Sequence, residues 1–178
     1  MYSVGDNVVY PCHGAGKIVR IASREVRGRR RDYITIQILH DRMTVMIPVE
    51  NAERAGLRKV IAAEAVDEVL EMLRGGAPAM PEKWHARAKC AQEKLGTGDI
   101  LQVAEVVRDL TLRAAGKVLS PGEKQMFDKA GKILASELMY ACELSAEEAV
   151  ALLDDVLGTT HVGGPVPADW IRESGRVA

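Results

Sequence analysis

The residues best suited to binding chemistry are a tryptophan and the cations around it, near the middle of the 178-residue chain. Trp84 lies among four basic side chains: Lys83, His85, Arg87 and Lys89. An indole is a large flat apolar wedge, and flanking Lys and Arg side chains can hold a polyanion against it. The same residues also suit a core tryptophan with solvated neighbours, because buried aromatic side chains dominate core energetics. The local sequence leaves a nucleic-acid contact and a core position equally open.

Catalytic and metal-binding patterns do not stand out in this sequence. Residues 14–17 have the wrong spacing for a phosphate-binding loop. Cys12 and His13 are neighbours, but nothing in the sequence indicates the third group that a catalytic thiol needs. The three cysteines, Cys12, Cys90 and Cys142, are widely spaced, which favours reduced thiols over a disulfide framework or a zinc site. We therefore predict a protein that is not an enzyme and that uses no metal or cofactor.

Charge is unevenly distributed along the chain, although the formal net charge is only −1. Residues 1–59 carry 11 Lys and Arg against 6 Asp and Glu, residues 60–119 carry 8 against 9, and residues 120–178 carry 5 against 10. Because the chain as a whole is nearly neutral, any contact with a polyanion must come from a local basic patch. No apolar run approaches the roughly 18 residues that span a bilayer, so we expect a soluble, cytoplasmic protein without a membrane partner.

The first sixty residues predict a small antiparallel β-barrel. Strands are expected around residues 8–10, 17–26, 33–38 and 43–48, where short apolar or alternating runs are bounded by turn residues. Gly28 lies in a basic turn, residues 27–31, and its freedom to adopt positive φ suits a hairpin. Four or five strands without an intervening helix suggest a barrel of SH3 or Tudor type, whose edge strands often pair with a partner strand. The basic turn fits either an anionic contact or a solvated hairpin tip.

The remainder of the chain predicts an all-α bundle. Apolar residues at helical spacing place helices over about residues 62–73, 81–95, 99–110, 120–138 and 145–156. Ser120 and Ser145 each precede a Glu three residues later, the pattern of a capping box, and Asp99 can cap the helix before them. The predicted fold class is α+β: a β-barrel domain of residues 1–59, a helical domain of residues 60–157, and a loose tail of residues 158–178 that contains Trp170.

Helical position does not decide the role of Trp84. Trp84, Ala88, Ala91 and Leu95 share one stripe of the helix expected from about Pro81, so the indole could belong to the core. A residue in the first turn of a helix can instead project beyond the end of a bundle, and Ala88 and Ala91 would then be the buried contacts. Both arrangements are compatible with the residues.

Segments spread over most of the chain, from Tyr2 to Leu157, carry a family resemblance. In order they are Val4-Gly5-Asp6, Val8-Val9-Tyr10-Pro11, His13-Gly14, Ile47-Pro48-Val49-Glu50-Asn51-Ala52, Gly56-Leu57-Arg58, Trp84 with the basic residues after it, Gly98-Asp99 and Val103-Ala104-Glu105-Val106-Val107-Arg108-Asp109-Leu110. Together they make the chain resemble the CarD/CdnL family of bacterial RNA polymerase-binding transcription regulators. So many segments in order are far more specific than any single motif.

The resemblance implies a Tudor-like N-terminal domain that docks on the β subunit of RNA polymerase. It also implies a helical domain that touches promoter DNA at the upstream edge of the transcription bubble, where a Trp wedges into the minor groove and stabilises the open complex. The residues that would face DNA are Trp84, Arg87, Lys89 and Lys124, and those that would contact polymerase are Arg24, Met46, Ile47 and Pro48. We expect a monomer that binds DNA largely without sequence specificity, at the nucleoid.

Two positions depart from the family pattern. Met46 stands where actinobacterial relatives carry a basic polymerase contact, and Ala86 replaces a basic neighbour of the tryptophan. A competing hypothesis makes the protein an adapter whose two domains both bind proteins, with Trp84 in the core and no direct DNA contact. The position of the Trp84 side chain separates the two hypotheses.

Overall fold

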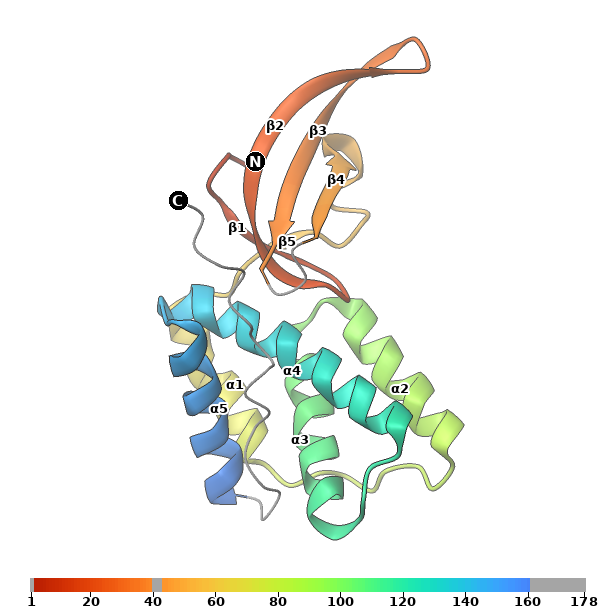
Figure 1. The fold of residues 1–178 in the computed structure, drawn as a ribbon, viewed down its shortest axis with the longest axis vertical. Helices are drawn as coiled ribbons and strands as arrows, with labels where there is room; N and C mark the ends of the chain where they lie inside the picture. Colours follow the sequence, from red (N-terminus) through yellow and green to blue (C-terminus); the bar gives the residue numbers. More distant parts are fainter. Residues whose placement is uncertain (1, 40–42, 161–178) are drawn as a thin grey trace.

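The computed structural model describes residues 2–39 and 43–160, which form an antiparallel sheet followed by five helices (Figure 1). Figure 1 shows the sheet standing on one end of the helical group, with the β2–β3 hairpin extending away from it. The fold is α+β, as the sequence predicts. The last helix continues to Thr160, into the segment predicted as a tail, and the rest of that tail, Trp170 included, lies outside the described residues.

Five antiparallel strands form the sheet. They are β1 (Asn7–Tyr10), β2 (Gly14–Val26), β3 (Arg29–Ile38), β4 (Thr44–Pro48) and β5 (Arg58–Lys59), in the spatial order β4-β3-β2-β1-β5. The β2–β3 hairpin turns at Arg27 and Gly28, whose φ angles of 53° and 73° are both positive. Two positive φ angles give the turn a twist that matches the flanking strands. The hairpin predicted at Gly28 is therefore confirmed.

The described strands form an open sheet, so the small antiparallel barrel expected from the sequence is not confirmed. β4 and β5 lie at opposite edges of the sheet and do not pair with one another. The connection between them, residues 49–57, folds over the apolar face and buries Ala52 and Leu57 against the isoleucines of β2 and β3. The core is thus covered by a loop segment, and pairing of the two edges is not needed to exclude water from it.

The five helices are α1 (Val66–Arg74), α2 (Trp84–Thr97), α3 (Ile100–Gly116), α4 (Pro121–Cys142) and α5 (Ala146–Thr160), and two short 3-10 helices cover Val49–Asn51 and Ala63–Ala65. The predicted caps are confirmed. The Asp99 carboxylate accepts a hydrogen bond from the N–H of Leu101, and Ser120 and Glu123 form a capping box at the start of α4. None of the described helices is long and apolar enough to cross a membrane.

An ion pair between a buried glutamate and a partly exposed arginine joins the sheet to the helices. Arg58 of β5 donates from Nη1 and Nη2 to the two carboxylate oxygens of Glu137 in α4, at 2.5 and 2.8 Å. The Glu137 side chain is fully buried. Arg58 Nε also donates to the carbonyl oxygen of Gly98, at the end of α2, at 2.7 Å. A buried backbone contact reinforces the junction, because the N–H of Ala15 donates to Ser136 Oγ at 2.9 Å. The sheet is therefore held against α2 and α4 together.

Candidate nucleic-acid interface around Trp84

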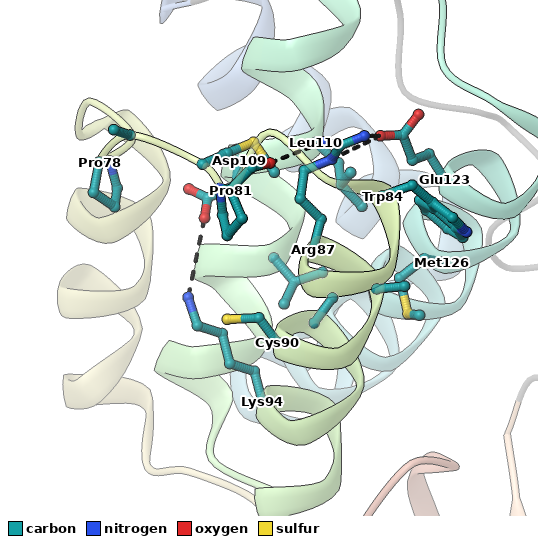
Figure 2. Close-up of a pocket in the computed structure, with 15 residues that line it drawn as sticks. Pro78, Pro81, Trp84, Arg87, Cys90, Lys94, Asp109, Leu110, Glu123 and Met126 are labelled. Atoms are coloured by element: carbon teal, nitrogen blue, oxygen red, sulfur yellow. Dashed lines mark hydrogen bonds and ion pairs between the residues drawn. The ribbon is translucent and has the colours of Figure 1, made fainter.

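Trp84 is the first residue of α2, so this helix begins later than its predicted start near Pro81. The indole is half-buried and lies across the first turn of α4. A Cβ added to Gly122 would lie 2.6 Å from Cζ2 and 2.8 Å from Cη2 of Trp84, so only a glycine leaves room for the ring in this position. Figure 2 shows the ring beside Glu123 and Met126. Trp84 thus lies where α2 and α4 begin, covered on one side by α4 and open on the other.

A buried carboxylate organises the residues around the indole. Glu123 is 2% exposed, and its Oε1 accepts from Nε and Nη2 of Arg87 at 3.1 and 3.0 Å and from Nε of Arg113 at 2.6 Å. Its Oε2 accepts from the N–H of Ser120 at 2.9 Å. Burial acts to raise the pKa of Glu123, but the hydrogen bonds from Ser120, Arg87 and Arg113 outweigh it and lower the pKa from 4.5 to about 2. The cluster ties the first turn of α2 to α3 and α4.

Arg87 is a member of this cluster, whereas the sequence predicted that it faces DNA. Its side chain is 8% exposed. Besides the bonds to Glu123, its Nη1 donates to the carbonyl oxygens of Pro81, at 2.8 Å, and of Glu82. These bonds hold residues 81–82 outside the helix, which accounts for the start of α2 at Trp84. The guanidinium braces the turn that carries the indole, and its burial leaves it poorly placed to reach a phosphate.

The other predicted DNA-facing cations are exposed on α2 and α4. Lys124 lies on the first turn of α4, two residues beyond Gly122. Lys89 pairs with Glu93 at 3.9 Å, but both side chains are more than two-thirds exposed, so the pair adds little to stability and does not hold the amine back. Lys83 and His85 are exposed next to the indole in the chain. The two helices that carry and cover the half-buried indole, α2 and α4, therefore also carry solvated cations.

The loop before α4 adds two residues that sequence reasoning missed. Lys117 and Val118 line one hollow together with Trp84 and Gly122. Val118 is 86% exposed, which is unusual for an apolar side chain. A valine between a lysine and a capping box, outside the apolar period of either helix, is the signal that could have identified it. The indole thus has an exposed apolar neighbour on a separate element.

A small apolar cavity of about 120 Å³ lies behind Trp84, between α2, α3 and the loop before α2. Figure 2 shows Cys90, Leu110 and Met126 lining it, with Lys94 and Asp109 paired across its far side at 4.0 Å. The cavity separates part of the α2 stripe from the core, so Ala88 and Ala91 are only half-buried. The tryptophan end of α2 is accordingly packed less tightly than its other end, where Leu95 is 2% exposed.

The residues predicted to contact polymerase lie on the sheet, far along the chain from Trp84. Arg24 is exposed on β2, directly opposite Arg31 of β3. Met46, 40% exposed, and half-buried Pro48 lie on β4, an edge strand of the described sheet. Ile47 differs from them because its side chain is 5% exposed and belongs to the core of the sheet. Only the backbone of Ile47 is therefore placed for a contact.

Replacing Gly122 by alanine should displace the indole of Trp84 while leaving the fold intact. The new methyl group would overlap the ring, whereas the helix itself prefers alanine to glycine by up to about 1 kcal/mol. We expect a red-shifted, more readily quenched Trp84 fluorescence, measured in a Trp170→Phe background, with thermal stability unchanged or slightly raised. The matched control is Gly96→Ala in α2, where an added Cβ meets nothing within 4 Å. An unchanged Trp84 spectrum in Gly122→Ala would contradict the packing described above.

Comparison with known proteins identifies the family to which this chain belongs. The model of the CarD-like/TRCF RID domain matches residues 2–61, and that of the CarD C-terminal domain matches residues 68–154. YdeB of Bacillus subtilis (strain 168) is 37% identical over 138 residues, which is 78% of this chain and 90% of YdeB. The NMR structure of the 72-residue N-terminal domain of Myxococcus xanthus CarD matches at 34% identity, covering 33% of this chain and 79% of that one, with a TM-score of 0.30. The chain belongs to the CarD family.

Proposed function

We propose that this CarD-family protein is a bacterial transcription regulator that docks on the RNA polymerase β subunit and stabilises the open promoter complex with Trp84. Two observations support the assignment as a transcription regulator: the chain belongs to the CarD family, and its relative YdeB is named as a transcription factor. The observation that carries the mechanism is the position of the indole. It lies half-exposed on Gly122 where α2 and α4 begin, braced by the buried Glu123 cluster, and both helices carry solvated cations.

The wedge acts through packing against bases. An apolar side chain inserted at a base step compensates for lost stacking, and contacts to phosphates hold it there without reading sequence. Trp84 supplies the flat ring, and Lys89 and Lys124 supply charge on the elements beside it. A rigid mount matters because the ring must meet the DNA edge in one orientation. The buried bonds of Glu123 to Arg87 and Arg113 provide that rigidity.

Docking uses the edge of the sheet. An edge strand presents unpaired backbone groups, to which a partner strand can add, and side chains along the strand then select the partner. β4 is such an edge, with Met46 facing solvent. Arg24 lies opposite Arg31 on β2 and β3, and Arg31 is paired with Glu50 at 3.0 Å, so exposed Arg24 is the charge on these two strands that an acidic partner surface would meet. Docking raises the effective concentration at the promoter, so weak DNA contacts suffice.

Trp84→Ala tests the wedge. Stacking of an aromatic side chain on a base is worth about 1–3 kcal/mol, so the lifetime of the open complex should fall by at least about fivefold. Polymerase binding should be unchanged, because Trp84 lies on the helices and the proposed dock lies on the sheet. Trp84→Phe should retain part of the effect. The measurement is the decay of promoter complexes after a competitor challenge, beside a binding assay with purified polymerase.

A second variant separates docking from wedging. Arg24→Glu combined with Met46→Glu should weaken polymerase binding and leave the binding of the free protein to DNA unchanged. If Trp84→Ala folds, binds polymerase and leaves the open-complex lifetime at the wild-type value, the wedge proposal fails and the adapter hypothesis replaces it. If the sheet variant binds polymerase normally, the dock lies elsewhere.

A further inference from the structure

A groove rich in lysine runs between the β1–β2 turn and the first half of α4, around a volume of about 640 Å³. Three of its lining side chains are Lys124, Lys129 and Lys132 of α4, and a fourth is His13 of the turn. None of the three lysines has an ion-pair partner among the residues that the structure describes. Asp128 is the carboxylate in the lining, so the groove is positive overall. The three lysines belong to residues 120–178, a part of the chain whose net charge is negative.

The sheet side of the groove is held in a fixed position. The rings of Tyr10 and His13 are stacked, with centroids 5.2 Å apart and planes at 9°. The turn then passes into β2, where the N–H of Ala15 donates to the buried Ser136 Oγ of α4 at 2.9 Å. His13 and the lysines are therefore presented across a junction that is itself buried and hydrogen-bonded.

The groove adjoins the site of Trp84. Pro121 lines both the groove and the hollow that contains Trp84 and Val118. From Gly122, under the indole, to Lys132, α4 advances by roughly 15 Å at 1.5 Å per residue. That length corresponds to about four base pairs of duplex, at 3.4 Å of axis each. A DNA backbone that leaves the indole along α4 would thus pass the lysines in succession.

We infer that this groove binds the sugar–phosphate backbone of the promoter DNA that continues from Trp84. The sheet then contacts DNA through His13, in addition to its proposed dock on polymerase. The inference rests on the proposed function, because it takes Trp84 as the point where DNA meets the protein. Lysines spaced along a helix, two exposed and one half-buried, suit a regularly charged backbone, and the phosphates they neutralise carry no sequence information.

The test is the salt dependence of DNA binding by the full chain. Lys129→Gln with Lys132→Gln removes two phosphate contacts, so the slope of log affinity against log salt should become shallower by about 1.8. Between 50 and 200 mM salt, the wild type should then lose about 12-fold more affinity than the variant. The probe is a fluorescent duplex with a melted segment at one end, followed by anisotropy. His13→Glu should weaken binding at low salt.

Arg29→Gln with Arg30→Gln is the matched control, since it removes the same charge from the exposed far end of the hairpin. Its salt slope should equal that of the wild type. A wild-type slope in the Lys129/Lys132 variant overturns the groove as a DNA surface, and the proposed function stands if Trp84→Ala still shortens the open-complex lifetime. A shallower slope with no effect of Trp84→Ala supports the groove and removes the wedge.

Discussion

Replacing Arg58 by alanine should lower the free energy of unfolding by about 3–5 kcal/mol. Glu137, its partner, is 0% exposed. Without the guanidinium, the Glu137 carboxylate keeps the N–H of Ile61, at 3.1 Å, but no opposite charge among the described residues. An isolated charge held away from water is strongly unfavourable, so either the carboxyl group takes up a proton or the sheet moves off α4, and both cost stability at neutral pH. Urea denaturation at neutral pH measures the loss.

Two comparisons show whether burial is the cause. Arg74→Ala removes an arginine whose pair with Glu71 is 3.0 Å long and lies between side chains that are 47% and 75% exposed. Such a pair contributes about 0–1 kcal/mol, so this variant should be nearly neutral. Arg58→Met combined with Glu137→Leu removes both charges and should recover most of the lost stability. If Arg58→Ala is no worse than Arg74→Ala, the pair does not anchor the sheet to the helices.

The Arg58–Glu137 junction connects stability to the proposed function. β4 and Trp84 belong to different halves of the protein, and Arg58 bonds both to α4 and to Gly98 at the end of α2, the helix that Trp84 begins. A dock and a wedge must keep a fixed separation if binding at one is to position the other. A bidentate ion pair fixes direction as well as distance. The junction thus makes the position of Trp84 depend on where the sheet is bound.

Local signals in the sequence predicted the elements well. The capping boxes at Ser120 and Ser145 mark helix starts because the serine and the glutamate that follows satisfy each other's backbone N–H groups within one turn. The hairpin at Gly28 follows from positive φ, another local property. The open sheet could not be predicted from such local signals. Its apolar face is covered because the 49–57 segment folds back over it, and the pattern of residues within the strands contains no information about that segment.

Only part of the candidate site could be predicted from the sequence, because local signals identify some of its residues and long-range packing decides the roles of the others. Trp84, Lys89 and Lys124 were identified by type and by resemblance, and the structure exposes all three at least partly. Arg87 was assigned to DNA by resemblance. Its partner Glu123 is 36 residues away in the chain, and helical periodicity contains no information about such a pair. Gly122 was missed because its importance comes only from the ring that lies on it. Long-range packing decides these roles, and one sequence does not display it.

Acidification should weaken the fold through Glu123 more than through any other capping carboxylate. The folded-state pKa of Glu123 is about 2 against an ordinary value of 4.5. Because the pKa is lowered by folding, the stabilisation is complete above pH 4.5 and is lost as the pH falls towards 2. A shift of this size corresponds to about 3 kcal/mol. Between about pH 6 and pH 3, the wild type should lose about 2 kcal/mol more than Glu123→Gln in urea denaturation.

Glu148→Gln is the matched control for this experiment. Glu148 occupies the same place in its own capping box, and hydrogen bonds from the backbone and hydroxyl of Ser145 lower its pKa, but it is exposed and binds no arginine in the described structure. The difference between the two variants therefore reports the combined effect of burial and of the bonds to Arg87 and Arg113. At neutral pH, Glu123→Gln leaves both guanidiniums without a counter-charge among the described residues, and it should also loosen Trp84, seen as increased fluorescence quenching. Equal pH dependence in the two variants would mean that the cap alone, without the arginines, holds the carboxylate and the turn that carries Trp84.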